Sequence, residues 1–311
     1  MGEKSKNIGE YGEEVVKNFL SLIGWHDISH GIQIPCKTRG HQSATKEQSK
    51  THGIDFLYSY KSQLVDGELV NVLVSVKFKQ TDYPNSATAL FKSFMSDLAN
   101  TMECFDKSDY KDSILQAQIP YNTHTDVGVL FFLCEPEDGE ATNNDYISIV
   151  SNAKISIEST KTIHLVDNKR FGFVRDLMNY VTSLKDFEYS FFYPNIGQNI
   201  NPTTRIDSGK TLPVEYVNSS VIPFKLENKN NNKEIAIFLG CIDNFEQDTF
   251  MRLLGLAKDL SKGWTGEVII GFPNYNNLKH QNDVSIAKQG FAEPKFTEKV
   301  KVINFHKPLN I

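Results

Sequence analysis

Two apolar runs separated by a polar turn decide the fold: His52-Gly53-Ile54-Asp55-Phe56-Leu57-Tyr58 and Val70-Asn71-Val72-Leu73-Val74-Ser75-Val76-Lys77-Phe78-Lys79-Gln80. The second run alternates with the period of a β-strand, so valines and Phe78 share one face while Leu73, Ser75 and Lys77 share the other. The turn between the runs contains Asp66-Gly67, a pair typical of hairpins. We therefore predict an antiparallel hairpin with a lysine in the middle of its second strand.

The length of the turn sets which residues face each other across the hairpin. A three-residue loop, with Gly67 in the left-handed conformation, pairs Leu64 with Glu68 and places Asp55 opposite Lys77. A two-residue loop would instead place Asp55 opposite Phe78. We prefer the first register because a buried carboxylate needs a charged partner, although a purely structural ion pair would need one as well.

Asp55 on one strand and Ser75-Val76-Lys77 on the next resemble the core of the PD-(D/E)XK nucleases, the restriction-endonuclease-like superfamily. In that family one strand carries Asp and the following strand carries Glu-x-Lys. Serine stands at the family's carboxylate position in this sequence. Some restriction enzymes with serine there take a glutamate from the helix after the lysine strand. That helix offers Asp97 and Glu103 here, but neither spacing matches well, so we prefer Glu13 as the replacement.

The segment before the hairpin adds to the resemblance. Residues 1–24 predict an amphipathic helix that contains Gly9-Glu10-Tyr11-Gly12-Glu13, similar to the Gly-x-x-Gly-Glu opening helix of the resolvase-like members. In the match, Glu13 falls on the glutamate that faces the active site. A solvated glutamate near the helix N-terminus is the alternative interpretation of Glu13.

The resemblance implies both a fold and an activity. The fold would be α/β, a restriction-endonuclease-like mixed central sheet flanked by helices. The activity would be that of a metal-dependent DNA endonuclease, such as those of bacterial anti-phage defence systems. Asp55, Glu13 and the backbone carbonyl of Val76 would bind Mg²⁺, for which Mn²⁺ would substitute. Lys77 would act beside the attacking water, and Ser75 would offer only a neutral hydroxyl.

Residues 25–52 are polar and basic, and we predict a loop that touches DNA phosphates. A solvated surface insertion is an equal alternative for this segment. A zinc site made by Cys36, His41 and His52 is a further alternative, but their spacing matches no recognised zinc pattern. Together with two residues at the end of the second strand, the predicted DNA-binding residues are Lys37, Arg39, Lys46, Lys50, Lys79 and Gln80.

The composition is that of an ordinary globular protein. The chain has 311 residues and a formal net charge of −5, which argues against a surface covered in nucleic acid but not against a local basic groove. The four cysteines form no CxxC pair, which favours a reducing cytoplasm. No signal peptide and no bilayer-spanning apolar run is evident, so we expect a cytoplasmic protein without a membrane partner.

After the hairpin we predict a helix at about 87–105, in which Cys104 is a buried thiol. The nearly continuous apolar run 126–134 predicts a buried central strand, and 147–150 predicts a short strand.

The chain suggests two domains. We place a nuclease-like domain at 1–205 and a C-terminal α/β domain at 206–311 that serves packing or partner docking. No ATPase or sensor motif is present, so we expect a second protein subunit or a homo-oligomer. A catalytically silent nuclease fold that binds DNA or a partner is the alternative function. A small-molecule enzyme is disfavoured because no dinucleotide loop or nucleophile elbow occurs.

Overall fold

A computed structural model describes residues 3–306, except 43–46, 85–86, 119, 138, 140–143, 156–160, 202, 204 and 263–265, and except the side chains of 232 and 233. The chain divides into two compact units, 1–171 with 213–218 and 172–212 with 219–311. The expected boundary lay near 205. The first boundary between the units lies earlier, after residue 171, because Phe187–Phe192 pairs with strands of the second sheet. Residues 213–218 return to the first unit, where the Val214 N–H donates to the Tyr60 hydroxyl at 2.9 Å.

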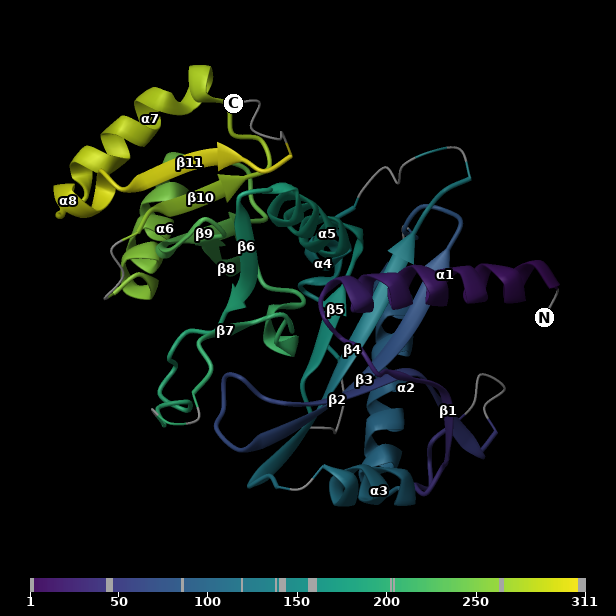
Figure 1. The fold of residues 1–311 in the computed structure, drawn as a ribbon. Helices are drawn as coiled ribbons and strands as arrows, with labels where there is room; N and C mark the ends of the chain where they lie inside the picture. The colour runs from purple at the N-terminus through teal and green to yellow at the C-terminus, as the bar shows by residue number, and fades with distance from the viewer. Residues whose placement is uncertain are drawn as a thin grey trace. The chain divides into compact units, whose positions relative to one another are not determined.

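The first unit is built on a five-stranded mixed sheet in the order β1-β2-β3-β4-β5 (Figure 1). The pairs β1–β2 and β2–β3 are antiparallel, whereas β3–β4 and β4–β5 are parallel. Its elements are α1 (Glu3–Leu22), β1 (Ser29–Pro35), β2 (Thr51–Lys61), β3 (Glu68–Lys79), α2 (Ala87–Asp106), α3 (Asp109–Ala117), β4 (Thr123–Cys134), α4 (Tyr146–Val150), β5 (Ile163–Val166) and the start of α5 (Asn168–Ser183).

Helices α1 and α2 cover opposite faces of this sheet (Figure 1). On the α1 face, Phe19 packs edge-on against Phe131 of β4, with ring centroids 5.6 Å apart. On the α2 face, Leu73 and Leu130 join a buried apolar cluster with residues of α2 such as Leu98. The predicted hairpin, both helices and the buried central strand are therefore confirmed.

Close packing of α1 on β3 depends on Gly12. A Cβ atom at this position would lie 2.3 Å from the Cβ of Phe78, far inside van der Waals contact. The ring of Tyr11 packs edge-on against the Phe78 ring, with ring centroids 5.3 Å apart. This close approach of α1 to Phe78 explains why position 12, just before Glu13, is a glycine.

Two local predictions were wrong. The segment 25–52 is not a continuous loop, because Ser29–Pro35 forms strand β1 and pairs with β2. The segment 147–150 is helical rather than extended: Asp145 caps α4 by accepting a hydrogen bond from the Ser148 N–H at 3.2 Å. Such a cap satisfies a backbone N–H that would otherwise lack an intrahelical partner.

The second unit has a six-stranded mixed sheet in the order β11-β10-β9-β8-β6-β7. Its apolar core gathers large buried side chains such as Phe250 and Phe272. Its remaining elements are β6 (Phe187–Phe192), β7 (Ser208–Gly209), β8 (Val221–Asn228), β9 (Asn231–Cys241), α6 (Gln247–Leu260), β10 (Val268–Phe272), α7 (Asn277–Gly290), α8 (Pro294–Thr297) and β11 (Val300–Asn304); the short 3₁₀ helix η1 (Val214–Tyr216) belongs to the first unit.

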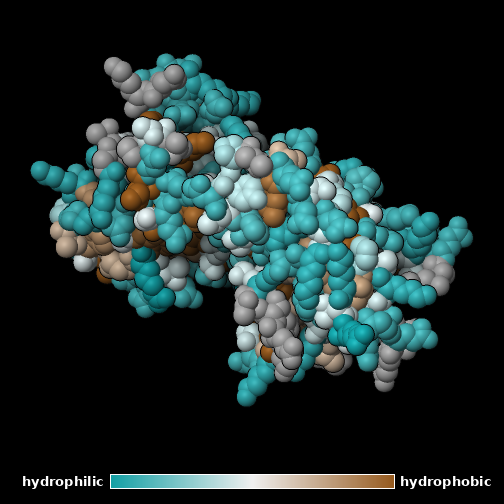
Figure 2. All heavy atoms as spheres, turned by 90° about the horizontal axis from the view of Figure 1, so that it is seen from below, coloured by the Kyte–Doolittle hydropathy of each residue, from teal (hydrophilic) through white to brown (hydrophobic). Residues whose placement is uncertain are grey.

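The surface is largely hydrophilic on the face that Figure 2 shows, where apolar side chains appear in separate small groups. Among the described residues, every helix is too short or too polar to cross a lipid bilayer.

Candidate active site

The candidate site lies where strands β2 and β3 separate. Their Cα register ends at the pair Phe56 and Val74. Before this point in the sequence, β2 pairs with β1 through Ile54, and after it β3 pairs with β4 through Val76. Asp55 therefore stands at the branch between the two strands, where backbone groups on the facing edges are no longer joined in a ladder.

The register of the hairpin differs from the predicted one. Continuing the observed pairs places Asp55 beside Ser75 rather than Lys77. The turn is longer than three residues because the Ser62 N–H already bonds to the Glu68 carbonyl at 2.9 Å, and the Ser62 hydroxyl accepts from the Leu64 and Val65 N–H groups. Since the shift is two residues, Asp55 and Lys77 still lie on the same face of the sheet.

Asp55 is half-buried and held by its neighbours on β3. Its Oδ2 accepts a hydrogen bond from the Val76 N–H at 2.6 Å. Burial raises the pKa of Asp55, and Asp97 raises it further; the Val76 N–H, the charge of Lys77 and a hydrogen bond from Ser75 oppose this increase. The carboxylate therefore has oriented donors around it, and yet burial makes its ionised form less favourable than that of an aspartate in water.

Lys77 is fixed by helix α2. Its Nζ lies 3.6 Å from Oδ2 of Asp97 and 5.5 Å from the ring centroid of Phe94. Among the described residues, Asp97 is the carboxylate in ion-pair contact with Lys77, whereas the prediction paired this lysine with Asp55. Asp55 still feels the ammonium charge, which lowers its pKa. Lys77 thus stands between two acids on one face of the sheet.

Glu13 approaches from the other helix, α1. Its pKa is raised, first by partial desolvation and then by the negative charges of Asp55 and Glu10, while His30 lowers it. Coulomb coupling between Glu13 and Asp55 places the two acids in one electrostatic neighbourhood. A carboxylate whose pKa is raised by the charge of a neighbouring carboxylate belongs to a site that a cation would stabilise.

The residues present fit a hard divalent cation. Mg²⁺ is bound through one or two carboxylates and keeps several waters. In an extended strand the N–H and C=O of one residue point to the same edge, so the Val76 carbonyl is directed to the edge where its N–H meets Asp55. Asp55, Glu13 and this carbonyl are therefore an oxygen-rich set of the kind that magnesium prefers.

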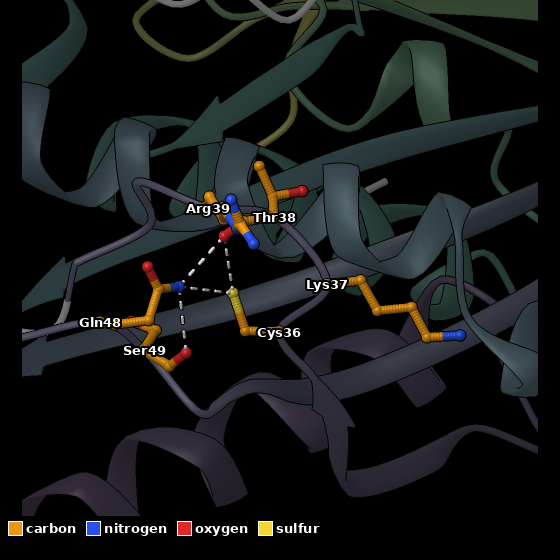
Figure 3. A pocket seen from close by; sticks show the side chains of 6 residues that line it. All are labelled: Cys36, Lys37, Thr38, Arg39, Gln48 and Ser49. Atoms are coloured by element: carbon orange, nitrogen blue, oxygen red, sulfur yellow. Dashed lines mark hydrogen bonds between the residues drawn. The ribbon is translucent and has the colours of Figure 1, made fainter.

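The predicted DNA-binding residues fall into two groups. Lys79 is the last residue of β3 and Gln80 follows it; both are half-buried. Lys37, Arg39 and Lys50 are exposed on segment 36–50, and two of them line a shallow pocket there with Cys36, Thr38, Gln48 and Ser49 (Figure 3). Lys46 lies outside the described residues.

The pocket in Figure 3 is held together by one amide side chain. Gln48 Nε2 donates to the carbonyl of Thr38 at 3.1 Å and to that of Ser49 at 3.4 Å, and it reaches Cys36 Sγ at 3.7 Å. Lys37 forms an ion pair with Asp109 at 3.1 Å. Segment 36–50 is therefore ordered by its own side chains over its described part.

The sequence predicts Glu13, rather than Asp97, as the replacement for the missing glutamate. The structure brings both acids into the electrostatic surroundings of Asp55. The signal was the spacing of Phe94 and Asp97 on α2, since side chains three apart in a helix share a face and both reach Lys77.

Comparisons with known proteins bear on the first unit. The model of the family described as "GAPS4 protein PD-(D/E)XK nuclease domain" matches residues 1–170. No curated protein matches the chain in sequence. The crystal structure of the central domain of yeast acetyl-CoA carboxylase aligns with 90% of this chain and 44% of its own, at 9% identity and a TM-score of 0.24. This chain thus spans less than half of that structure, and the likeness is too low to inform fold or function.

The restriction-endonuclease-like fold expected from the sequence is confirmed by the mixed sheet, its flanking helices and the family match. PD-(D/E)XK nucleases generally use divalent metals. Because the family model covers more than half of the 311 residues, the chain belongs to the family of the GAPS4 protein PD-(D/E)XK nuclease domain.

Proposed function

We propose that this chain is a metal-dependent DNA endonuclease that hydrolyses phosphodiester bonds. One observation carries the proposal: Asp55 is hydrogen-bonded to Val76 at the branch of β2 and β3, with Lys77 on the same face and Glu13 coupled to it. A structural ion pair would need neither the second acid nor the raised pKa values. Perturbed acids beside a fixed cation are typical of catalytic sites.

Three groups would hold the metal: the Asp55 carboxylate, the Glu13 carboxylate and the Val76 carbonyl. We assign Mg²⁺, with Mn²⁺ as a substitute. When bound, the ion supplies Lewis-acid polarisation of the phosphate and lowers the pKa of a water. Ser75 has no charge to offer, and its hydrogen bond instead favours the ionised form of Asp55.

Lys77 would act on the transition state. Its ammonium group is held by Asp97 and Phe94, so its position is fixed before substrate binds. A fixed positive charge beside the reacting phosphate stabilises the charge that develops there and orients the attacking water. Asp97 is therefore a positioning residue in this proposal, and Glu13 is the acid that replaces the family's glutamate.

The partner we propose is double-stranded DNA, contacted through its phosphates by Lys37, Arg39, Lys46, Lys50, Lys79 and Gln80. Such contacts would make binding fall steeply with salt. We also propose a role in anti-phage defence in the cytoplasm, with a second subunit or another copy of the chain as protein partner. The family match supports a nuclease.

The decisive experiment is nicking of supercoiled plasmid by the purified full chain with Mg²⁺, with Mn²⁺ and with a chelator. Cleavage should need the metal and should be lost in Asp55→Asn and Lys77→Met. Asp112→Asn and Lys92→Met remove exposed charges of the same kinds on α3 and α2 and should leave cleavage intact. Equal cleavage by the wild type and both site variants would refute the proposal.

The alternative is a silent nuclease fold that binds DNA or a partner, and Ser75 is the observation that favours it, because the family's carboxylate is missing there. DNA binding with no cleavage under either metal, and no metal binding at Asp55, would decide for this alternative.

A further inference from the structure

Four metal-ligating side chains converge in the first unit. Cys36, His41, His52 and Cys104 place one potential ligand atom each within 4.8 Å of the others, and three of the four residues are buried. Among the described residues, this is the group of three or more such side chains that is arranged to hold an ion. Cys36 and His41 lie on segment 36–50, His52 lies on β2 and Cys104 lies on α2.

The separations match those of a tetrahedral zinc site. Zinc bonds of about 2.3 Å to sulfur and about 2.0–2.1 Å to nitrogen require roughly 3.8 Å between two sulfurs, roughly 3.6 Å between sulfur and nitrogen and roughly 3.3 Å between two nitrogens. The two sulfurs are 3.9 Å apart and the nitrogens His41 Nδ1 and His52 Nε2 are 3.2 Å apart. His41 Nδ1 lies 3.7 Å from Cys36 Sγ and 3.4 Å from Cys104 Sγ.

The surroundings also resemble those of a metal site. His41 directs Nδ1 into the cluster, and its other nitrogen lies 3.2 Å from Glu103 Oε2. A carboxylate on the outer nitrogen fixes the ring and selects the tautomer that can bind a metal. The backbone N–H of Lys37 donates to Cys104 Sγ at 3.4 Å, a contact that suits a thiolate.

A disulfide between Cys36 and Cys104 does not account for the cluster. Both cysteines are free, and a bond between them would require the sulfurs to approach to about 2.05 Å. It would also leave unexplained why His41 Nδ1 lies within 3.7 Å of both sulfurs and 3.2 Å from His52 Nε2. Cys₂His₂ with all four positions filled by protein is the pattern of a structural zinc site.

We infer that this chain binds one Zn²⁺ through Cys36, His41, His52 and Cys104, and that the ion is structural. It ties segment 36–50, which carries exposed Lys37, Arg39 and Lys50, to strand β2 and helix α2. His52 lies three residues before Asp55 on β2, and Cys104 lies on the helix that also carries Asp97. The site therefore fixes a basic segment relative to the proposed catalytic centre.

The sequence indicates three of these ligands, Cys36, His41 and His52, but not the fourth. Cys104 is far away in the sequence, inside an apolar helix where a buried thiol was expected. The fold supplies it, because α2 packs against β2, which carries His52, and against β1, which leads into Cys36.

The test is metal content measured by elemental mass spectrometry on the full chain purified without added metal. We expect about one zinc per chain, lost by at least half in Cys104→Ser and in His52→Asn. Cys134→Ser and Cys241→Ser remove buried cysteines outside the cluster and should keep the zinc. Asp55→Asn should also keep it, so failure of the nuclease proposal and failure of this one are distinguishable.

Variants that fail to fold would not decide the matter, so the wild type provides a second measurement. Chelated and reconstituted with Co²⁺, it should show the intense visible absorption of tetrahedral, thiolate-bound cobalt at about one equivalent. A zinc-free protein that takes up no Co²⁺ in this form, or zinc retained in both ligand variants, would overturn the inference.

Discussion

The Val76 backbone N–H donates a 2.6 Å hydrogen bond to Oδ2 of Asp55 across the branch of β2 and β3. This bond fixes one oxygen of a half-buried carboxylate whose pKa is nevertheless raised, first by burial. A raised pKa means that the ionised form is less favourable in the folded chain than in the unfolded chain, so keeping Asp55 charged near neutral pH lowers the free energy of unfolding.

Asp55→Asn should therefore separate stability from activity. Metal-dependent cleavage should fall by about 100-fold or more, because the amide is a far weaker ligand for a hard cation. The melting temperature should stay the same or rise, because the amide oxygen can still accept from Val76 and no buried charge is left. Thermal unfolding beside Asp112→Asn checks this. A large loss of stability would show that Asp55 is a structural residue.

The pH dependence of metal binding should reflect the acids of the site. The pKa values of Asp55 and Glu13 are both raised above the ordinary values of 3.8 and 4.5, so protons should displace the metal at a higher pH than for isolated carboxylates. As the pH falls, the Mn²⁺ affinity measured by calorimetry should decline at a higher pH in the wild type than in Asp97→Asn. Asp97→Asn removes a charge that raises the pKa of Asp55, so its decline should begin at lower pH. If the pH midpoint of Mn²⁺ binding in Asp97→Asn is unchanged or higher, Asp97 does not raise the pKa of Asp55.

A glutamate at position 75 should be able to replace the negative charge of Glu13. Glu13→Gln should weaken Mg²⁺-dependent cleavage by roughly 10- to 100-fold, the range seen for losing a supporting group of a metal site. Adding Ser75→Glu to it restores the family's carboxylate beside Asp55 and should recover most of the loss. Glu14→Gln, an exposed neighbour on the same helix, is the control. If Ser75→Glu gives no recovery, Glu13 does not replace the missing acid.

Gly12 should prove essential for seating α1 on the sheet. Gly12→Ala introduces a Cβ 2.3 Å from that of Phe78, and overpacking of this kind costs about 1–3 kcal/mol of unfolding free energy. Gly9→Ala is the matched control, since nothing lies within 4 Å of its added Cβ and alanine favours helices by up to about 1 kcal/mol. Chemical denaturation of both variants checks the difference. Equal stabilities would mean that α1 shifts at no cost.

The elements with strong periodicity could be predicted from the sequence. The alternation of 70–79, the apolar stripe of α1 and the unbroken apolar run of β4 each fixed an element and its neighbours. The hairpin register could not be read from Asp66-Gly67, because Ser62 closes a longer turn with its own hydroxyl. Strand β1 was missed because its burial is almost entirely on one residue, Ile34, so its sequence lacks a clear pattern.

Some features of the candidate site could likewise be predicted from the sequence, and others could not. Asp55 and Lys77 follow from a local motif and lie on one face as expected. The partner of Lys77 depends on how α2 packs on the sheet, and that contact is not encoded in local spacing. The fourth cysteine of the proposed zinc cluster was hidden for the same reason.

Lys77 provides the sharpest test of the chemistry. In Lys77→Met the half-buried stem is kept and the charge is removed, so the fold and the metal affinity should change little. The rate of cleavage at saturating Mg²⁺ should fall by about 100- to 1000-fold, the usual effect of losing a fixed charge on the transition state. Lys92→Met, on the exposed side of the same helix that positions Lys77, should cleave like the wild type. Lys77→Met with normal turnover and weaker DNA binding would instead make Lys77 a phosphate contact, because a lost binding contact raises the substrate requirement without slowing the chemical step.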